Sequence, residues 1–266
     1  MKITAIIPVR MQATRFSGKP LALILGLPMV EHVRRRVSLC RELSNVIVAT
    51  CDQEIKEVVE KAGGKVIMTA DTHQRCTDRI AEAARNIDAD IIINVQGDEP
   101  LVIPEMMNAV IEPFLSDLKV PCVNMIAPIL EKEEFEDPNA PKVVRNLKGD
   151  ILYISREPIP SKKKAAHENY PKWKQLGLIA FRSDFLQTFA RLKPTLLEEV
   201  ESVDMMRAIE HGFRVRTVVT EAKMIGVDVP ADVGKVEQVL RTDPLFERYM
   251  SRSVNAGQTN DERMVI

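Results

Sequence analysis

The sequence predicts an α/β fold in which a doubly wound, mostly parallel sheet is covered by helices on both faces. Short apolar runs rich in β-branched residues recur along the chain, and Ile91–Val95 (IIINV) is the clearest of them. Such runs are typical of strands that are buried on both faces of a parallel sheet. Amphipathic stretches of about ten residues separate these runs, and the alternation indicates repeated strand–helix–strand units. We expect a single domain over residues 1–245.

The first half of the chain follows this alternation closely. Its apolar runs predict strands at Ile3–Val9, Val46–Thr50, Lys65–Thr69 and Ile91–Val95. Segments with apolar residues at helical spacing predict helices at Pro28–Leu39, Asp52–Ala62, Thr77–Ile87 and Ile103–Leu118. Gly63 and Gly64 favour the end of the second helix, and Pro104 suits the first turn of the fourth.

The second half is less regular. Strands are expected at Val120–Ile129, Leu176–Phe181 and Arg214–Thr220, and a hairpin joins Lys142–Arg145 to Ile151–Ser155 through Gly149. Helices are expected from Ser183, as a cap, to Leu192, and at Glu198–Gly212 and Pro230–Leu240. Residues 130–180 then form an antiparallel excursion. Within it, the basic segment Ser161–Lys174, with Lys162, Lys163 and Lys164, reads as a solvated loop rather than an anion site. The polar residues 251–266 predict a disordered tail.

The composition is that of an ordinary globular protein. The 266 residues are 45% hydrophobic and 28% charged, with a formal net charge of −1. This balance gives no overall field for nucleic acid or for a membrane surface, and we expect neither as a partner. The four cysteines have no C-x-x-C spacing, so we expect no zinc site. Cys40, Cys51 and Cys122 lie in or beside apolar runs, which predicts reduced core thiols of an intracellular protein. The apolar run at the N-terminus is too short for a signal peptide, so we expect a cytoplasmic protein.

One carboxylate follows the most apolar strand directly. Gln96, Gly97 and Asp98 come straight after Ile91–Val95. Ligands of open α/β sheets bind at the carboxyl ends of the strands, and a carboxylate there is a suitable ligand for Mg²⁺. A polar turn that merely ends the strand is an equally good interpretation of these residues alone.

The loop after the first strand carries a cluster of cations. Arg10, Arg15 and Lys19 lie within Arg10–Pro20 (RMQATRFSGKP), at the sheet edge where Asp98 is expected. Guanidinium forks bind oxygens in pairs, and such a loop favours a polyphosphate over a merely solvated role. The loop is not a P-loop, because Pro20 replaces the metal-binding Ser or Thr, and the G-x-G-x-x-G pattern of dinucleotide-binding folds is absent.

Several uncommon segments together resemble the sugar-acid cytidylyltransferases, most closely those that act on 3-deoxy-manno-octulosonate (KDO). The loop matches the pattern A-R-x-x-S-T-R-x-x-G-K-P of that family. The other matching segments follow in family order between Ile6 and about Leu240: IVAT, AGGKVIMT, VQGDEPLV, PNAPKVV, YISREPIP and GVDVPAD. The resemblance implies a Rossmann-like nucleotidyltransferase fold and a homodimer that forms through the antiparallel excursion.

The same resemblance implies a reaction. Members transfer CMP from CTP to the anomeric hydroxyl of a 2-keto sugar acid in nucleotide-sugar and lipopolysaccharide biosynthesis, and they release pyrophosphate. It implies that Arg10, Arg15 and Lys19 hold the triphosphate, and that Asp98 and Asp228 bind Mg²⁺. Arg10, Lys19, Asp98 and Asp228 are then the catalytic residues. No dedicated general base stands out, so we expect the metal to assist deprotonation of the sugar hydroxyl.

The stretch that recognises the base in the family departs from its pattern H-x-S-G-T-E-R. Here it reads His73–Arg79 (HQRCTDR), so that Arg75 and Cys76 replace Ser and Gly. We expect Arg75, Cys76 and Asp78 to contact the nucleotide, with cytosine as the base unless the pocket is remodelled. His73 is slightly better explained as a structural histidine.

The expected acceptor side departs further. The family pattern H-L-G-x-Y-x-Y reads QLGLIAF at residues 175–181, and L-E-Q-L-R gives way to a segment with Asp204 and Met205. Loss of groups that bond a substrate costs discrimination steeply, so we expect a related acidic sugar or a modified ulosonate, or KDO bound differently. The candidate acceptor-binding residues are Gln96, Arg156, Gln175, Asp204 and Arg207.

There are three alternative functions, two of them enzymatic and one non-catalytic. A nucleotidyltransferase of this fold could use another base or acceptor. A glycosyltransferase is less suitable, because Glu99-Pro100 follows Asp98 where a D-x-D motif would be typical. A non-catalytic nucleotide-binding paralogue would have had no need to keep Arg10, Lys19 and Asp98.

Overall fold

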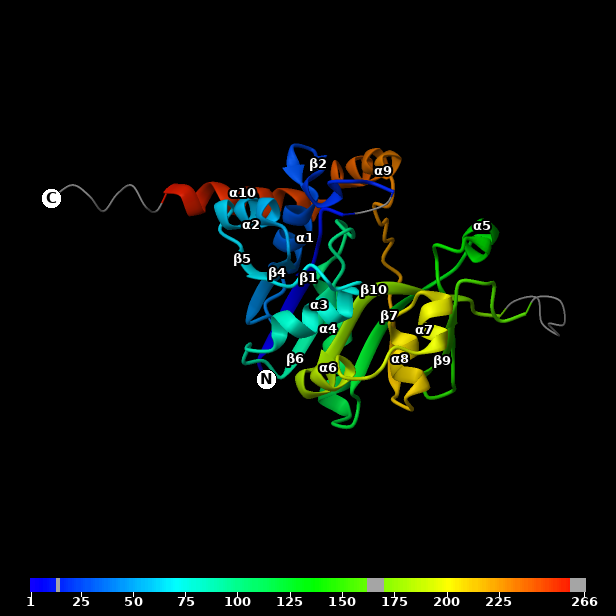
Figure 1. Ribbon diagram of the computed structural model, residues 1–266. Helices are drawn as coiled ribbons and strands as arrows, with labels where there is room; N and C mark the ends of the chain where they lie inside the picture. Colours follow the sequence, from blue (N-terminus) through cyan, green and yellow to red (C-terminus); the bar gives the residue numbers. More distant parts are fainter. Residues whose placement is uncertain (13–14, 162–169, 259–266) are drawn as a thin grey trace.

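The computed structural model describes residues 1–12, 15–161 and 170–258, with side chains described as far as Ser251. A large sheet crosses the molecule in the order β11-β7-β10-β6-β1-β4-β5, and helices cover both of its faces (Figure 1). The strands on this path are β1 (Ile3–Pro8), β4 (Asn45–Thr50), β5 (Lys65–Met68), β6 (Ile91–Val95), β7 (Cys122–Pro128), β10 (Trp173–Arg182) and β11 (Val215–Val219).

The sheet is mostly parallel, as predicted. Strand β1 pairs in parallel with β4 and β6, β4 with β5, and β7 with β11. Strand β10 is the exception, because it runs antiparallel between β6 and β7. The register pairs Ile3 with Ile91 and Ile6 with Asn94, so β1 and β6 end side by side. The loop after β1 and the segment Gln96–Asp98 therefore leave the sheet at the same edge.

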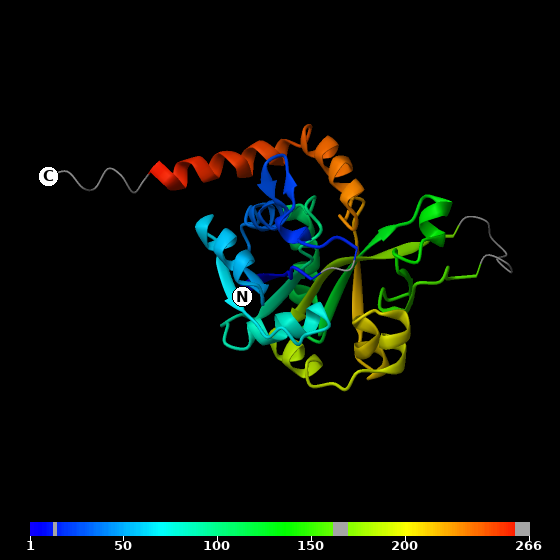
Figure 2. The same ribbon diagram turned by 45° about the horizontal axis from the view of Figure 1, so that its top comes forward.

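Two layers of helices pack against the sheet (Figures 1 and 2). On one face α1, α2 and α4 bury Val33, Ile55 and Met107 against the sheet, and on the other α3, α6 and α8 bury side chains such as Ile80 and Phe189. The bounds are α1 (Met29–Val37), α2 (Gln53–Lys61), α3 (Cys76–Ala84), α4 (Pro104–Ser116), α6 (Ser183–Phe189), α7 (Leu196–Glu201), α8 (Met205–Glu210) and α9 (Pro230–Leu240).

The region after α6 differs from the single helix expected at Glu198–Gly212. Ser202 takes a left-handed conformation with φ of 52°, which ends α7, and α8 begins three residues later at Met205. Ser183 is the first residue of α6 rather than its cap, because its hydroxyl donates to the Ala89 carbonyl. A short helix, α5 (Lys132–Glu136), occupies an acidic stretch for which no helix was expected.

The antiparallel excursion is present as a hairpin. Strands β8 (Lys142–Arg145) and β9 (Ile151–Ser155) have the predicted bounds, and β8 also pairs with the start of β10. Strand β10 therefore begins at Trp173, three residues before the expected Leu176. Lys162, Lys163 and Lys164 lie outside the described residues.

The C-terminal helix α10 (Pro244–Gln258) continues past residue 251, from which the sequence predicted a disordered tail. Its first turns are anchored, because Tyr249 bonds His32 of α1 and Phe246 stacks on the same ring. A helix nucleated on such packing can extend into a polar stretch that has no anchors of its own. Residues 259–266 lie outside the described part of the chain. Within that part, no helix is long and apolar enough to cross a membrane.

Candidate active site

A cavity of about 700 Å³ opens at the carboxyl ends of β1 and β6. Its walls come from the first loop, from the segment after β6, from the N-terminus of α3, and from two residues further along the chain, Asp204 and Asp228. The predicted site residues that line it are Arg10, Arg15, Lys19, Arg75, Cys76, Gln96, Asp98, Asp204 and Asp228. The sheet edge chosen from the sequence is therefore where the largest group of predicted residues meets.

Lys19 joins the two predicted metal-binding carboxylates. It begins a 3₁₀ turn, η1 (Lys19–Leu21), directly after Gly18, which takes a left-handed φ of 71°. The Lys19 Nζ lies 2.6 Å from Asp98 Oδ2 and 3.8 Å from Asp228 Oδ1. Arg15 Nη2 reaches the same Asp228 oxygen at 3.0 Å. Two cations thus gather around two carboxylates.

The backbone brings these distant segments together. The Val227 N–H donates to the Asp98 carbonyl at 2.9 Å, so the loop before α9 is fixed to the end of β6. Gly97 permits the close approach of the first loop, because a Cβ there would lie 2.2 Å from a Val9 methyl. Arg10 remains exposed, with Nη1 3.5 Å from the His73 carbonyl.

Glu99, which the sequence interpretation left without a role, lies behind Asp98. Burial raises the pKa of Glu99 to about 7, and the neighbouring charge of Asp98 contributes in the same direction. Its Oε1 accepts the Gly177 N–H at 3.1 Å. A Cβ on Gly177 would lie 2.9 Å from that oxygen and 2.2 Å from the Gln96 side chain, which explains the glycine in β10.

Arg79 is a second residue that the sequence interpretation missed. It lines the cavity from α3, is 3% exposed, and donates through Nη1 to Thr69 Oγ1 at 2.5 Å and to the Ala70 carbonyl at 3.3 Å. Its buried Nη2 has no hydrogen-bond partner among the described residues. The signal that could have identified Arg79 was its position in residues 73–79, the stretch that matches the base-recognition pattern of the family. His73, which precedes α3, pairs with Glu82 of that helix, and this contact agrees with a structural role.

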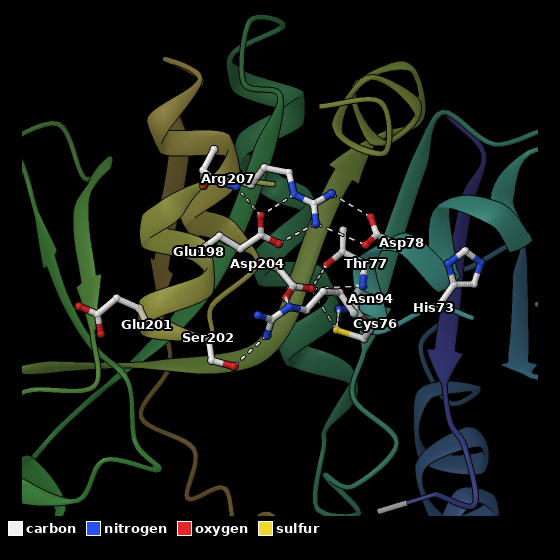
Figure 3. A network of polar contacts seen from close by, with 12 residues as sticks. His73, Cys76, Thr77, Asp78, Asn94, Glu198, Glu201, Ser202, Asp204 and Arg207 are labelled. Atoms are coloured by element: carbon white, nitrogen blue, oxygen red, sulfur yellow. Dashed lines mark hydrogen bonds and ion pairs between the residues drawn. The ribbon is translucent and has the colours of Figure 1, made fainter. Parts of the chain in front are cut away.

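The far wall joins α3 to the turn between α7 and α8 (Figure 3). Asp204 Oδ2 accepts the Thr77 hydroxyl at 2.7 Å and lies 3.5 Å from the Cys76 sulfur. Gln96 donates to the same sulfur at 3.1 Å. Burial, followed by the charge of Asp204, raises the pKa of Cys76 to about 12. This thiol is therefore neutral and fills space between two polar side chains.

Four predicted site residues do not line the cavity: Asp78, Arg156, Gln175 and Arg207. Arg207 is 3% exposed, with its guanidinium divided between Glu198, at 2.6 and 2.8 Å, and Asp78, at 2.9 and 3.3 Å (Figure 3). Arg156 donates through Nε, Nη1 and Nη2 to the backbone carbonyls of residues 201, 138 and 202. Gln175 donates to Asn124 Oδ1 at 2.6 Å. These donors already have protein partners.

The parallel sheet and its cation-rich, dicarboxylate cavity define a nucleotidyltransferase-type domain. The chain belongs to the cytidylyltransferase family, whose model, described as "Cytidylyltransferase", matches residues 4–222. It is 45% identical to a 3-deoxy-manno-octulosonate cytidylyltransferase from Geobacter metallireducens, over 90% of this chain and 98% of that protein. It is 43% identical to the protein of the same name from Geotalea uraniireducens, over 91% and 100%.

Solved structures give the same result. A CMP:2-keto-3-deoxy-manno-octonic acid synthetase complexed with CTP superposes with a TM-score of 0.85 and 36% identity, over 91% of this chain and 99% of that one. A glucose-1-phosphate thymidylyltransferase described from Bacillus anthracis has a TM-score of 0.63 but 14% identity, over 91% and 96% of the two chains. That second likeness shows a shared fold only.

Proposed function

We propose that the protein transfers CMP from CTP to the anomeric hydroxyl of KDO or a closely similar acidic sugar. The observation that carries this proposal is the placement of Lys19 between Asp98 and Asp228 at the mouth of the β1–β6 edge. The names of the relatives supply the nucleotide and the acceptor. In the reaction, the hydroxyl oxygen bonds to the α-phosphorus of CTP, the bond to the bridging oxygen breaks, and pyrophosphate leaves.

Mg²⁺ is the proposed cofactor, held by Asp98 and Asp228. Their carboxylates fit such an ion because both already face one cation, the Lys19 ammonium. Among the described residues no group of three or more His, Cys, Asp or Glu side chains could hold a metal. That suits Mg²⁺, which takes one or two carboxylates and completes its shell with phosphate oxygens and water. When bound, it would neutralise charge on the leaving pyrophosphate.

The chain's own cations have a separate task. Arg15 Nη2 lies 3.0 Å from Asp228 Oδ1, and Lys19 Nζ lies 2.6 Å from Asp98 Oδ2. These are the carboxylates that would bind the metal. A triphosphate offers these cations new oxygens, so both can exchange a carboxylate for a phosphate when CTP enters. Arg10, which is exposed beside His73, can join them. Such positioning and charge stabilisation carry most of the catalysis in phosphoryl-type transfer.

We further propose that the protein is a cytoplasmic homodimer whose contact includes the excursion at residues 130–180. The free state of all four cysteines agrees with a reducing compartment. Exposed apolar side chains on this part of the chain, Leu130, Leu147 and Leu152, would suit a contact between copies. Light scattering on purified protein should give twice the chain mass of 30.0 kDa.

The function is tested by pyrophosphate release with Mg²⁺, crossing CTP, UTP, ATP and GTP with a panel of ulosonic and uronic acids that includes KDO. We expect turnover with CTP and with KDO or a modified ulosonate. Turnover with another acid alone would assign the change in specificity to the altered segments around Gln175 and Asp204. Turnover with another nucleotide would contradict the proposed base, and nucleotide binding without turnover would favour the non-catalytic alternative.

A further inference from the structure

Arg75 is a cavity-lining cation whose side chain reaches the turn between α7 and α8. It directly precedes α3, and its side chain is 27% exposed. Its Nη1 donates to Ser202 Oγ at 2.8 Å, and its Nε lies 3.8 Å from Asp204 Oδ1. Both partners come from the turn between α7 and α8.

The Arg75 guanidinium has two protein partners and still has N–H groups available for a ligand. Nη1 donates to Ser202 and Nε lies within ion-pair distance of Asp204, while Nη2 makes no hydrogen bond among the described residues. Asp204 is itself occupied, because its Oδ2 accepts both the hydroxyl and the N–H of Thr77. An arginine oriented in this way can present a donor pair to a planar anion such as a carboxylate.

The other arginines expected near the acceptor cannot take that role as they stand. Arg207 is buried and binds two carboxylates. Each of the three guanidinium nitrogens of Arg156 donates a hydrogen bond to a backbone carbonyl. Arg79, which was not among the expected acceptor residues, also has an unpartnered Nη2. That side chain is only 3% exposed, however, and its Nη1 is held by the Thr69 hydroxyl and the Ala70 carbonyl. An acidic acceptor would meet Arg75 as the cavity cation with a free donor on the Asp204 side.

We propose that Arg75 binds the carboxylate of the acidic acceptor and sets the preference for an acid over a neutral sugar. The inference rests on the proposed function, since it assumes an acidic acceptor. It reassigns Arg75 from the nucleotide, where the sequence placed it, to the sugar. Ser202 and Asp204 then serve as positioning residues that hold the guanidinium ready.

The test compares Arg75→Gln with the wild type in steady-state pyrophosphate release. Loss of a charged hydrogen bond to a carboxylate should raise the KM for the acceptor by about 10- to 100-fold. The KM for CTP should change by less than about 3-fold. Arg75→Lys keeps the charge without the fork and should recover part of the loss. The matched control is Arg85→Gln, an exposed arginine just beyond the other end of α3, which should leave both constants unchanged.

A substrate pair separates binding of the carboxylate from a structural effect. The wild type should use the free acid at least about 10-fold more efficiently than its methyl ester, and Arg75→Gln should lose most of this preference. An unchanged acid-to-ester ratio in Arg75→Gln, or a rise confined to the KM for CTP, would overturn the inference. A wild type that releases no pyrophosphate with any sugar acid would instead overturn the proposed function on which the inference depends.

Discussion

Asp98 is the residue on which the proposed chemistry depends most. Its carboxylate lies 2.6 Å from the Lys19 ammonium at the end of the most buried strand. Replacing Asp98 by Asn should lower kcat by about 10²- to 10³-fold, the usual cost of losing one charge contact in a transition state. It should also raise the Mg²⁺ concentration needed for half-maximal rate. Pyrophosphate release at varied Mg²⁺ measures both effects.

Asp88→Asn is the matched control for that change, because Asp88 is exposed near the opposite end of β6, where it pairs with Lys2. It should leave both the rate and the Mg²⁺ requirement as they are. If Asp98→Asn kept wild-type kcat and an unchanged Mg²⁺ response, Asp98 would not be a metal ligand.

At the residue level, the sequence predicted the centre of the site better than its walls. Lys19 and Asp98 could be placed together, because strand ends can be inferred from apolar runs and β1 and β6 are adjacent. Asp228 was placed with them by the family resemblance. Arg207 was predicted to bind the acceptor, but its guanidinium lies in buried ion pairs. No sequence pattern reveals that Glu198 and Asp78 would occupy its guanidinium, because those partners come from different helices.

Among the elements, α3, α7 and α8 are joined by the ion triad of Arg207, Glu198 and Asp78 (Figure 3). The Glu198 side chain is 2% exposed and that of Asp78 is 26% exposed. Glu198→Ala would leave a buried guanidinium with one partner, so it should destabilise the protein by about 3 kcal/mol. Asp78→Ala should cost about 1 kcal/mol, because water can reach that edge. Urea unfolding measures both.

Glu199→Ala, at the exposed neighbouring position of α7, should change the free energy of unfolding by less than about 0.5 kcal/mol. Equal losses for Glu198→Ala and Asp78→Ala would contradict the assignment of Glu198 as the buried partner. A neutral Glu198→Ala would show that the triad does not hold these helices together.

The contact between α1 and α10 predicts a pH dependence of stability. His32 is fully buried, with Nε2 2.7 Å from the Ile24 carbonyl and Nδ1 2.7 Å from the Tyr249 hydroxyl. The carbonyl can only accept, so Nε2 carries the proton and Nδ1 accepts from Tyr249. Burial, assisted by the charge of Arg36, lowers the pKa of His32 to about 4.

The unfolded chain binds this proton near pH 6.5, whereas the native chain binds it only near pH 4. The free energy of unfolding should therefore fall as the pH drops from 6.5 to 4, by up to about 3 kcal/mol from this group. His32→Gln can keep both hydrogen bonds without titrating, so it should lack this part of the loss. Urea unfolding from pH 7 to pH 4 compares the two proteins, and parallel curves would contradict the assignment.

Elements with strong local signals were predicted well. β6 and α9 have the predicted bounds, because an apolar run between polar residues and a proline at a helix start are local features. The break at Ser202 was missed, since nothing in that stretch marks a left-handed residue. α10 was missed in part because its anchor, His32, lies more than 200 residues earlier in the chain.

At the scale of the whole molecule, one sheet edge collects residues from the entire length of the chain. Lys19, Asp98, Asp204 and Asp228 all line one cavity, although more than 200 positions separate the first from the last. The net charge of −1 gave no sign of this, because it sums 37 basic and 38 acidic residues over the whole chain and does not show which of them meet at one place. The order of strands, and not composition, creates the site.

The most direct test of the central claim is the mass of the product formed from CTP and KDO with Mg²⁺, followed together with pyrophosphate. We expect a CMP ester of KDO, with one pyrophosphate released for each molecule formed. The same assay on Asp98→Asn should show the product only at a greatly reduced rate. Hydrolysis of CTP to free CMP without a sugar conjugate, or consumption of CTP without pyrophosphate, would contradict the assignment as a CMP transferase.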